Sequence, residues 1–212
     1  MNTITSLLYQ IPILLMSLTI HEYSHGITAY YLGDDTAKRA GRLNLNPISH
    51  IDPIGLLMLF IVHIGWAKPV PINPFNFKNY KRDTAITAAA GPVSNFLMAI
   101  IFSIIFHILQ GIIPAESIMT GFSKTIFFAL YYAVLINLAL GIFNLIPLPP
   151  LDGSKILGGF LTDKQYASYT ARERQGAMIL MIVFAADYML HLGLIRAIIE
   201  APLSFFINLL LR

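Results

Sequence analysis

Long apolar runs dominate the chain, and short polar segments separate them. An apolar run of about 20 residues is long enough to span a membrane as a helix. Five runs reach or approach this length, at residues 4–32, 85–113, 125–147, 175–195 and, more weakly, 197–211. The pattern predicts an all-α polytopic membrane protein with about five spanning helices.

Three shorter segments predict other structures. Residues 53–66 are apolar but too short for a comfortable crossing. They form either a short tilted helix or a re-entrant hairpin that enters and leaves by one face. Residues 65–74 contain three prolines, so we expect an extended segment there. The alternation of residues 42–46 favours a short strand.

The third long run ends in the sequence N-L-I-P-L-P-P-L-D-G at residues 144–153. Its prolines cannot continue a helix, so the backbone breaks there. Non-helical backbone at membrane depth is tolerated only inside protein or beside a water-filled cavity. We therefore expect this loop to form part of a site.

The composition agrees with a membrane protein. The chain is 56% hydrophobic and 12% charged, whereas soluble domains have about 45–50% and about 25% of these residues. It has no cysteine, which excludes disulfides and cysteine-ligated metal sites. The net charge of +3 gives no reason to expect a nucleic-acid partner. We expect one membrane domain over residues 1–212, with a core at 4–160 and C-terminal helices at 175–211. The first run is expected to act as an uncleaved signal anchor.

The distribution of basic residues predicts the orientation. Lysines and arginines follow the first run, precede the second and follow the third, whereas residues 111–122, between the second and third runs, have none and carry Glu116. The positive-inside rule then places the N-terminus outside and the basic segments in the cytosol. This layout requires residues 53–66 to be re-entrant.

Residues 21–25 read H-E-Y-S-H and interrupt the first apolar run. On a helix, His21 and His25 lie one turn apart, with Cβ atoms about 5–6 Å from each other, so both imidazoles can bind one metal ion. H-E-x-x-H is the signature of zinc metalloproteases, in which the glutamate, here Glu22, acts as general base. The alternative is a hydrogen-bonded polar cluster without metal.

A catalytic zinc usually takes three protein ligands and one water. We expect Asp152 to be the third ligand, because its loop breaks at the depth of the histidines. The alternative is that Asp152 caps a helix at residues 154–160. Asp52 is a competing carboxylate that reads equally well as the cap of residues 53–60. The polar positions His21, Asn95, Asn144 and Asp152 all lie toward the cytosolic side.

Three separated motifs resemble the site-2 proteases, a family of intramembrane zinc metalloproteases. They are H-E-Y-S-H, G-P-x-x-N at residues 91–95 and N-x-x-P-x-P-P-L-D-G at residues 144–153; residues 65–74 resemble the small bacterial branch without added regulatory domains. The resemblance covers roughly residues 19–160. It implies one Zn²⁺ bound by His21, His25 and Asp152, with Glu22 as the catalytic acid and base. It also implies that Asn95 and Asn144 line the cleft and assist substrate binding or the oxyanion.

The expected function is hydrolysis of peptide bonds in or near transmembrane segments of other proteins, in the cell membrane and toward its cytosolic side. A helical substrate has to unwind, and we expect it to pair through its backbone with residues 65–74 or 42–46. Two other classes are an ion or proton transporter and a catalytically silent scaffold that binds membrane segments. The sequence leaves the oligomeric state open.

For the remaining ionisable groups in or beside the apolar runs, the sequence predicts no catalytic role. His50 and His63 flank the short hairpin and are expected at the membrane interface, and His107 lies toward the outer end of its span. Asp187 and His191 lie one turn apart on one helix. They either pair with each other or affect gating and water access.

Overall fold

The computed structural model describes residues 3–62, 65–118 and 120–212. Within these ranges the chain is helical, with no strand and one isolated antiparallel bridge. The long helices are α1 (Thr3–Tyr31), α4 (Tyr80–Ile112), α6 (Gly121–Asn144), α9 (Glu173–Leu190) and α10 (Leu194–Leu210). The prediction of helices at these five places is confirmed, with ends that differ by a few residues.

Shorter helices connect the long ones. They are α2 (Thr36–Arg39), α3 (Pro53–Val62), α5 (Ala115–Ile118), α7 (Asp152–Phe160) and α8 (Asp163–Thr170), with 3₁₀ turns at Pro47–His50 and Pro74–Asn76. As predicted, the backbone leaves the helical path after Asn144 and resumes it only at Asp152.

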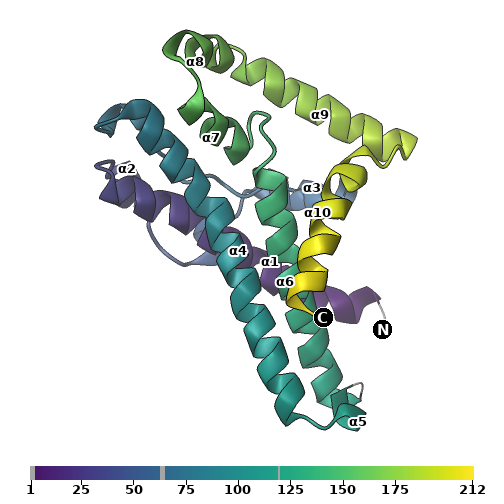
Figure 1. Cartoon of the computed structure of the whole chain (residues 1–212). Helices are drawn as coiled ribbons and strands as arrows, with labels where there is room; N and C mark the ends of the chain where they lie inside the picture. Colours follow the sequence, from purple (N-terminus) through teal and green to yellow (C-terminus); the bar gives the residue numbers. More distant parts are fainter. Residues whose placement is uncertain (1–2, 63–64, 119) are drawn as a thin grey trace.

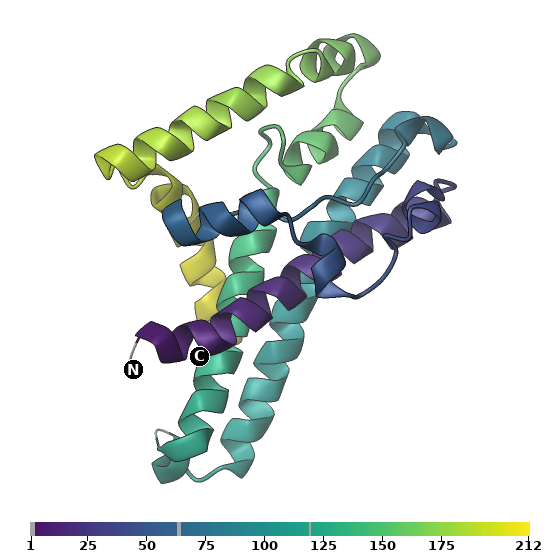
Figure 2. The same ribbon diagram turned by 180° about the vertical axis from the view of Figure 1, so that it is seen from behind.

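Helices α4 and α6 lie side by side, and α1 crosses them (Figures 1 and 2). Helix α10 packs against α6, where Ala99, Val134 and Leu138 form a buried core. Helix α5 lies at one end of the α4–α6 pair, whereas α2, α7 and α8 lie at the other (Figure 1). Helices α1, α4 and α6, together with α7, thus position the site described below.

Two of the described helices, α4 and α6, are long and apolar enough to cross a membrane. Along α4, large apolar side chains are exposed at one-turn intervals, as at Leu97, Ile101, Ile104 and Ile108. An apolar stripe of this length is costly in water and suits contact with lipid. Crossing by α1, α9 and α10 stays a prediction.

After α3, the chain returns to the end at which that helix begins. Ala67 forms the bridge with Ile51, and the Lys68 N–H donates to the His50 carbonyl over 2.9 Å. Gly55 permits this return, because a Cβ there would collide with the backbone oxygen of Trp66. His63 lies outside the described residues.

The predicted strand at residues 42–46 is wrong. The segment is irregular, because its asparagines bind the backbone locally: Asn44 Oδ1 accepts from the Asn46 N–H and Asn46 Oδ1 from the Ile48 N–H. Such local bonds compete with strand pairing. His50 is buried against this loop, with its ring Nε2 bonded to the Asn44 carbonyl over 2.9 Å, and its place at the membrane interface stays a prediction.

Residues 65–74, which we call the cleft strip, are extended as predicted and are fixed to α1 at their far end. The buried carboxylate of Asp34, just beyond α1, accepts from the Asn73 N–H and from Asn76 Nδ2, both over 2.7 Å. It also accepts from Thr36. Burial by itself raises the pKa of Asp34, but these hydrogen bonds outweigh it and hold that pKa below its ordinary value. Asp34 thus positions the strip.

Replacing Asp34 with Asn should destabilise the protein at neutral pH by about 1–3 kcal/mol, because an amide cannot accept all of these bonds. The folded pKa is depressed, so the carboxylate contribution is complete above the unfolded pKa of about 3.9 and is lost as the pH falls through the folded pKa. In thermal unfolding in detergent, the melting temperatures of the wild type and of Asp34→Asn should converge at low pH. The matched control is Asp35→Asn, since the Asp35 side chain is half-exposed and pairs with Arg39. A loss as large in the control would contradict the assignment.

Candidate metal centre

Three potential metal-ligand atoms converge between α1 and α7. His21 Nε2 and His25 Nε2 are 3.0 Å apart, and Asp152 Oδ2 lies 3.1 Å from the first and 3.3 Å from the second. All three side chains are buried. Two histidines from one turn of α1 and one carboxylate from the start of α7 therefore form a compact triangle.

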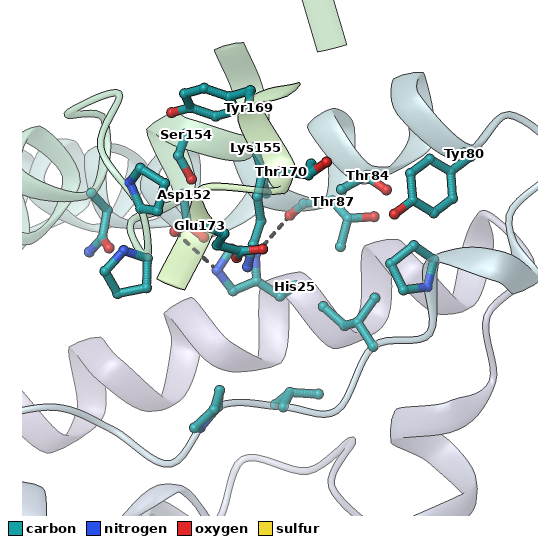
Figure 3. Close-up of a pocket in the computed structure, with 18 of the residues that line it drawn as sticks. His25, Tyr80, Thr84, Thr87, Asp152, Ser154, Lys155, Tyr169, Thr170 and Glu173 are labelled. Atoms are coloured by element: carbon teal, nitrogen blue, oxygen red, sulfur yellow. Dashed lines mark hydrogen bonds and ion pairs between the residues drawn. The ribbon is translucent and has the colours of Figure 1, made fainter. Parts of the chain in front are cut away.

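Each imidazole donates a hydrogen bond from the nitrogen on its far side. The nitrogen that faces the triangle is therefore left with a free lone pair. His25 Nδ1 donates to the Thr87 carbonyl over 2.7 Å (Figure 3). His21 Nδ1 donates to Asn95 Oδ1 over 2.6 Å. With the protons on Nδ1, both Nε2 atoms of the neutral rings are acceptors. Asp152 Oδ2 is likewise buried without a hydrogen-bond donor among the described residues.

Three acceptors that face one another repel unless a cation lies between them. A tetrahedral zinc ion, bound about 2.0–2.2 Å from each ligand, separates its ligand atoms by about 3.3 Å. The three observed separations are close to this value, and two imidazoles with one carboxylate are a donor set typical of catalytic zinc. The residues present therefore fit a zinc ion.

Gly91 on α4 lets that helix approach the two imidazoles. A Cβ at this position would lie 2.5 Å from His25 Nε2 and 2.6 Å from His21 Nε2. Asn95 lies one turn further along the same face of α4, where it reaches His21. In G-P-x-x-N, the glycine thus allows the close approach of α4 to the imidazoles, and the asparagine one turn later makes the hydrogen bond to His21.

Glu22 lies beside the ligands in a cavity of about 460 Å³. Its Oε2 accepts from the Val70 N–H over 2.8 Å, so the cleft strip holds one carboxylate oxygen. The cavity also contains Asn144 from the end of α6. Glu22 and Asn144 are therefore placed where a bound peptide could meet them.

The opposite wall of the cavity comes from α7, α8 and the start of α9, which sequence reasoning missed. Lys155, Tyr169 and Glu173 lie near His25 and Asp152 in the close-up (Figure 3). Burial, followed by a hydrogen bond with Tyr80, raises the pKa of Tyr166, which keeps that phenol neutral. Residues 161–174 are polar and lack a motif, so only their fold brings them to the site.

The structure separates the alternatives for the two aspartates. Asp152 is the first residue of α7, and Leu151 occupies the N-cap position, so the capping alternative is wrong. The Asp52 side chain accepts from the N–H groups of Ile54 and Gly55 and therefore caps α3. Asp152, and not Asp52, joins the histidines.

Asn95 is placed differently from its expected position on the cleft. It is fully buried behind His21, and its Nδ2 donates to Asn137 Oδ1 over 3.0 Å. Its amide is thus occupied by two protein partners and cannot reach an oxyanion in the cavity. Asn137 escaped the sequence analysis, although an amide in the middle of an uncharged apolar run was a usable signal.

Asp187 and His191 have roles in the fold rather than a shared one. Asp187 Oδ1 accepts from the Leu194 N–H at the start of α10 over 2.6 Å. His191 ends α9 with a left-handed backbone. Within the described ranges, no hydrogen bond or ion pair joins the two side chains. His107 Nε2 bonds the Leu210 carbonyl, far along α4 from the metal centre.

The fold and the site define a class: an all-helical, membrane-embedded protein with a two-histidine, one-aspartate metal centre and a glutamate beside it. The model of peptidase family M50 matches residues 9–186. The chain therefore belongs to peptidase family M50, the site-2 protease family.

Curated relatives agree with this family. The Bacillus subtilis (strain 168) protein named "Putative zinc metalloprotease YwhC" is 38% identical over 178 residues, which cover 83% of this chain and 80% of the relative. "Putative zinc metalloprotease Rip2" of Mycolicibacterium smegmatis is 25% identical over 80% of this chain, but this match spans only 63% of that relative. The comparison with solved structures gave no match.

The metal centre can be tested by measuring bound zinc in purified variants. His25→Ala and Asp152→Ala should each lose the metal, because either change removes one of three ligands. Asp52→Ala, which removes a helix cap instead, is the matched control and should retain about one zinc per chain. Zinc lost from Asp52→Ala and kept by Asp152→Ala would overturn the ligand set.

Proposed function

We propose that this chain hydrolyses peptide bonds in or near the membrane-spanning segments of other proteins, with His21, His25 and Asp152 as zinc ligands. The observation that carries the proposal is the convergence of three buried lone pairs beside Glu22 in one cavity. Membership of the M50 family supports the same reaction. The protein acts as a zinc metalloprotease of the site-2 type.

Zinc held by these ligands supplies a Lewis acid that polarises the scissile carbonyl and lowers the pKa of a water toward about 7. Glu22 accepts a proton from the attacking water and later gives it to the leaving nitrogen. The Val70 N–H holds Oε2 of Glu22, and this fixes the carboxylate next to the ligands. The Asn144 amide, whose Nδ2 already donates to the Leu140 carbonyl over 3.0 Å, has a second N–H that can donate to the substrate.

The substrate lies extended between the cleft strip and the wall formed by α7 to α9. Backbone pairing with the strip is more restricted than the sequence suggested. The N–H groups of Lys68, Val70 and Asn73 already have partners inside the protein, and three of the other strip residues are prolines. The Lys68 carbonyl already accepts from Arg42, and Val70 is buried. The other strip carbonyls and the side chain of Ile72 are therefore the main substrate contacts.

The proposed topology has crossings by α1, α4, α6 and α10, with the N-terminus outside and the active site toward the cytosol. A fifth crossing, by α9, is not supported: the Leu210 carbonyl at the end of α10 bonds Ser103 and His107 in the outer half of α4, so the start of α10, and with it the end of α9, lies toward the cytosol. The return of the chain after α3 supports a re-entrant segment at residues 53–66. The basic segments around α2, the start of α4 and α8 lie at the end opposite α5 (Figure 1), and Lys81 pairs with Asp163 there. Exposed apolar side chains along α9 support its contact with lipid.

The other functions expected from composition are not favoured. A transporter would explain buried polar groups, but not an orphaned carboxylate oxygen facing two imidazole lone pairs. A silent scaffold has no need for a carboxylate held beside the ligands. We propose the whole chain, residues 1–212, as one metalloprotease domain.

The reaction is tested with purified enzyme and a panel of fusion proteins that each carry one membrane segment. Glu22→Gln should lower the cleavage rate by about 100- to 10,000-fold, the range for losing a general acid and base. It should keep its zinc, because Glu22 is not a ligand. Full activity in Glu22→Gln would exclude this residue as the base, and no cleavage by the wild type would count against the reaction.

The topology is tested with single cysteines, since the chain has none of its own. Cysteines at Lys38, Lys81, Lys164 and Gly193 should react with impermeant reagents only from the cytosolic side, and that at Glu116 only from outside. Labelling of position 81 from outside would mean that residues 53–66 cross the membrane. Labelling of position 193 from outside would mean that α9 crosses.

A further inference from the structure

A chain of hydrogen bonds runs from α6 through α4 to a metal ligand on α1. Asn137 Nδ2 donates to the Ala133 carbonyl over 2.9 Å, and Asn137 Oδ1 accepts from Asn95 Nδ2 over 3.0 Å. Asn95 Oδ1 in turn accepts from His21 Nδ1 over 2.6 Å. Both asparagines are fully buried. The ligand is thus connected to the backbone of a helix to which it does not itself belong.

The direction of this chain is fixed by its last member. The Ala133 carbonyl can only accept, so the Asn137 NH₂ group faces it and the Asn137 oxygen faces Asn95. Asn95 must then present its NH₂ group to Asn137 and its oxygen to His21. Only one tautomer of His21 satisfies that oxygen, namely the one with the proton on Nδ1. The Nε2 lone pair is left for the metal.

The two histidines therefore differ in how they are oriented. A backbone carbonyl of α4 holds His25 directly, and a backbone carbonyl cannot rotate. The partner of His21 is a side-chain amide, which can turn by 180° and exchange its oxygen for its nitrogen. After such a turn, the Asn95 NH₂ group would face the His21 Nδ1–H, and both groups are donors. Asn137 prevents that turn by offering the Asn95 NH₂ group an acceptor.

We infer that Asn137 is a positioning residue for the metal centre, which acts through Asn95 to keep the His21 Nε2 lone pair on the metal. The inference rests on the proposed function, because it requires a metal at the three ligands. It assigns a role in metal binding to a residue of α6, a helix that supplies none of these ligands. Partners behind a metal-bound histidine commonly change metal affinity by about 10- to 100-fold.

The test measures zinc affinity by competition with a chromophoric chelator, and no substrate is needed. Asn137→Leu has a similar volume but leaves Asn95 Nδ2 without an acceptor, so zinc should bind about 10- to 100-fold more weakly. Asn137→Asp should bind zinc nearly as the wild type does. Its neutral form offers an O–H to Ala133 and a carbonyl oxygen to Asn95, and its ionised form still accepts from Asn95.

A control in α4 distinguishes the expected effect on the metal ligand from a general loss of packing. Ser103→Ala also removes a buried hydrogen bond, from Ser103 Oγ to the Leu210 carbonyl, two turns beyond Asn95. It should leave zinc affinity unchanged. With Co²⁺ in place of zinc, the visible absorption bands should shift in Asn137→Leu and stay in place in Ser103→Ala. Should Asn137→Leu fail to fold, Asn137→Ser replaces it, because its hydroxyl can reach Ala133 but is too short for Asn95.

The outcomes distinguish this inference from the proposed function. A wild-type protein that binds no zinc contradicts the proposed function. A wild type that binds zinc, together with an Asn137→Leu or Asn137→Ser protein of equal affinity, contradicts the role of Asn137 alone. Equal losses in the Leu and Asp variants, or a loss in Ser103→Ala as large as in Asn137→Leu, also overturn it.

Discussion

The burial of three mutually facing lone pairs is the constraint on which the rest of the structure depends. His21, His25 and Asp152 present acceptor atoms to one another at 3.0–3.3 Å inside an apolar helical protein. Removing such groups from water is costly unless a cation and hydrogen-bond donors or acceptors compensate them. The fold supplies the second part of this compensation: each imidazole has a fixed partner on its far side, on α4.

This constraint accounts for several features that look unrelated in the sequence. Helix α4 has to come within contact of α1, which requires Gly91, and it has to carry an acceptor one turn later, which Asn95 supplies. Helix α6 has to end at the same level, so that the loop after Asn144 can deliver Asp152. The unwound loop is tolerated because it lies inside protein and beside a cavity.

The cleft strip connects the metal centre to the rest of the chain. Both carboxylates that hold it belong to α1 or its immediate continuation, since Glu22 binds the Val70 N–H and Asp34 binds the Asn73 N–H. Helix α1 and the residues directly after it therefore carry two ligands, the proposed base and both anchors of the strip. Their relative positions are set largely within one rigid element, which suits chemistry that depends on distances of a few tenths of an ångström.

The sequence by itself determined the features that arise from local patterns. Apolar runs predicted the long helices, the prolines predicted the break after Asn144 and the extended strip, and the one-turn spacing of His21 and His25 predicted that they share a face. These features follow from the period of the helix and from the missing N–H of proline. The H-E-Y-S-H motif singled out Glu22, and the depth of the loop break singled out Asp152, as neighbours of the histidines.

Only the tertiary structure decided which partner each polar group takes. The sequence could not show that Asn95 lies behind His21 rather than on the cleft, that Asn137 fixes its amide, or that Glu22 binds the Val70 N–H. It also favoured a strand at residues 42–46, where local asparagine bonds prevailed. The physical reason is that a hydrogen bond between distant residues depends on the depth and rotation of each helix against its neighbours. Those quantities are set by packing over the whole molecule, and a local pattern does not contain them.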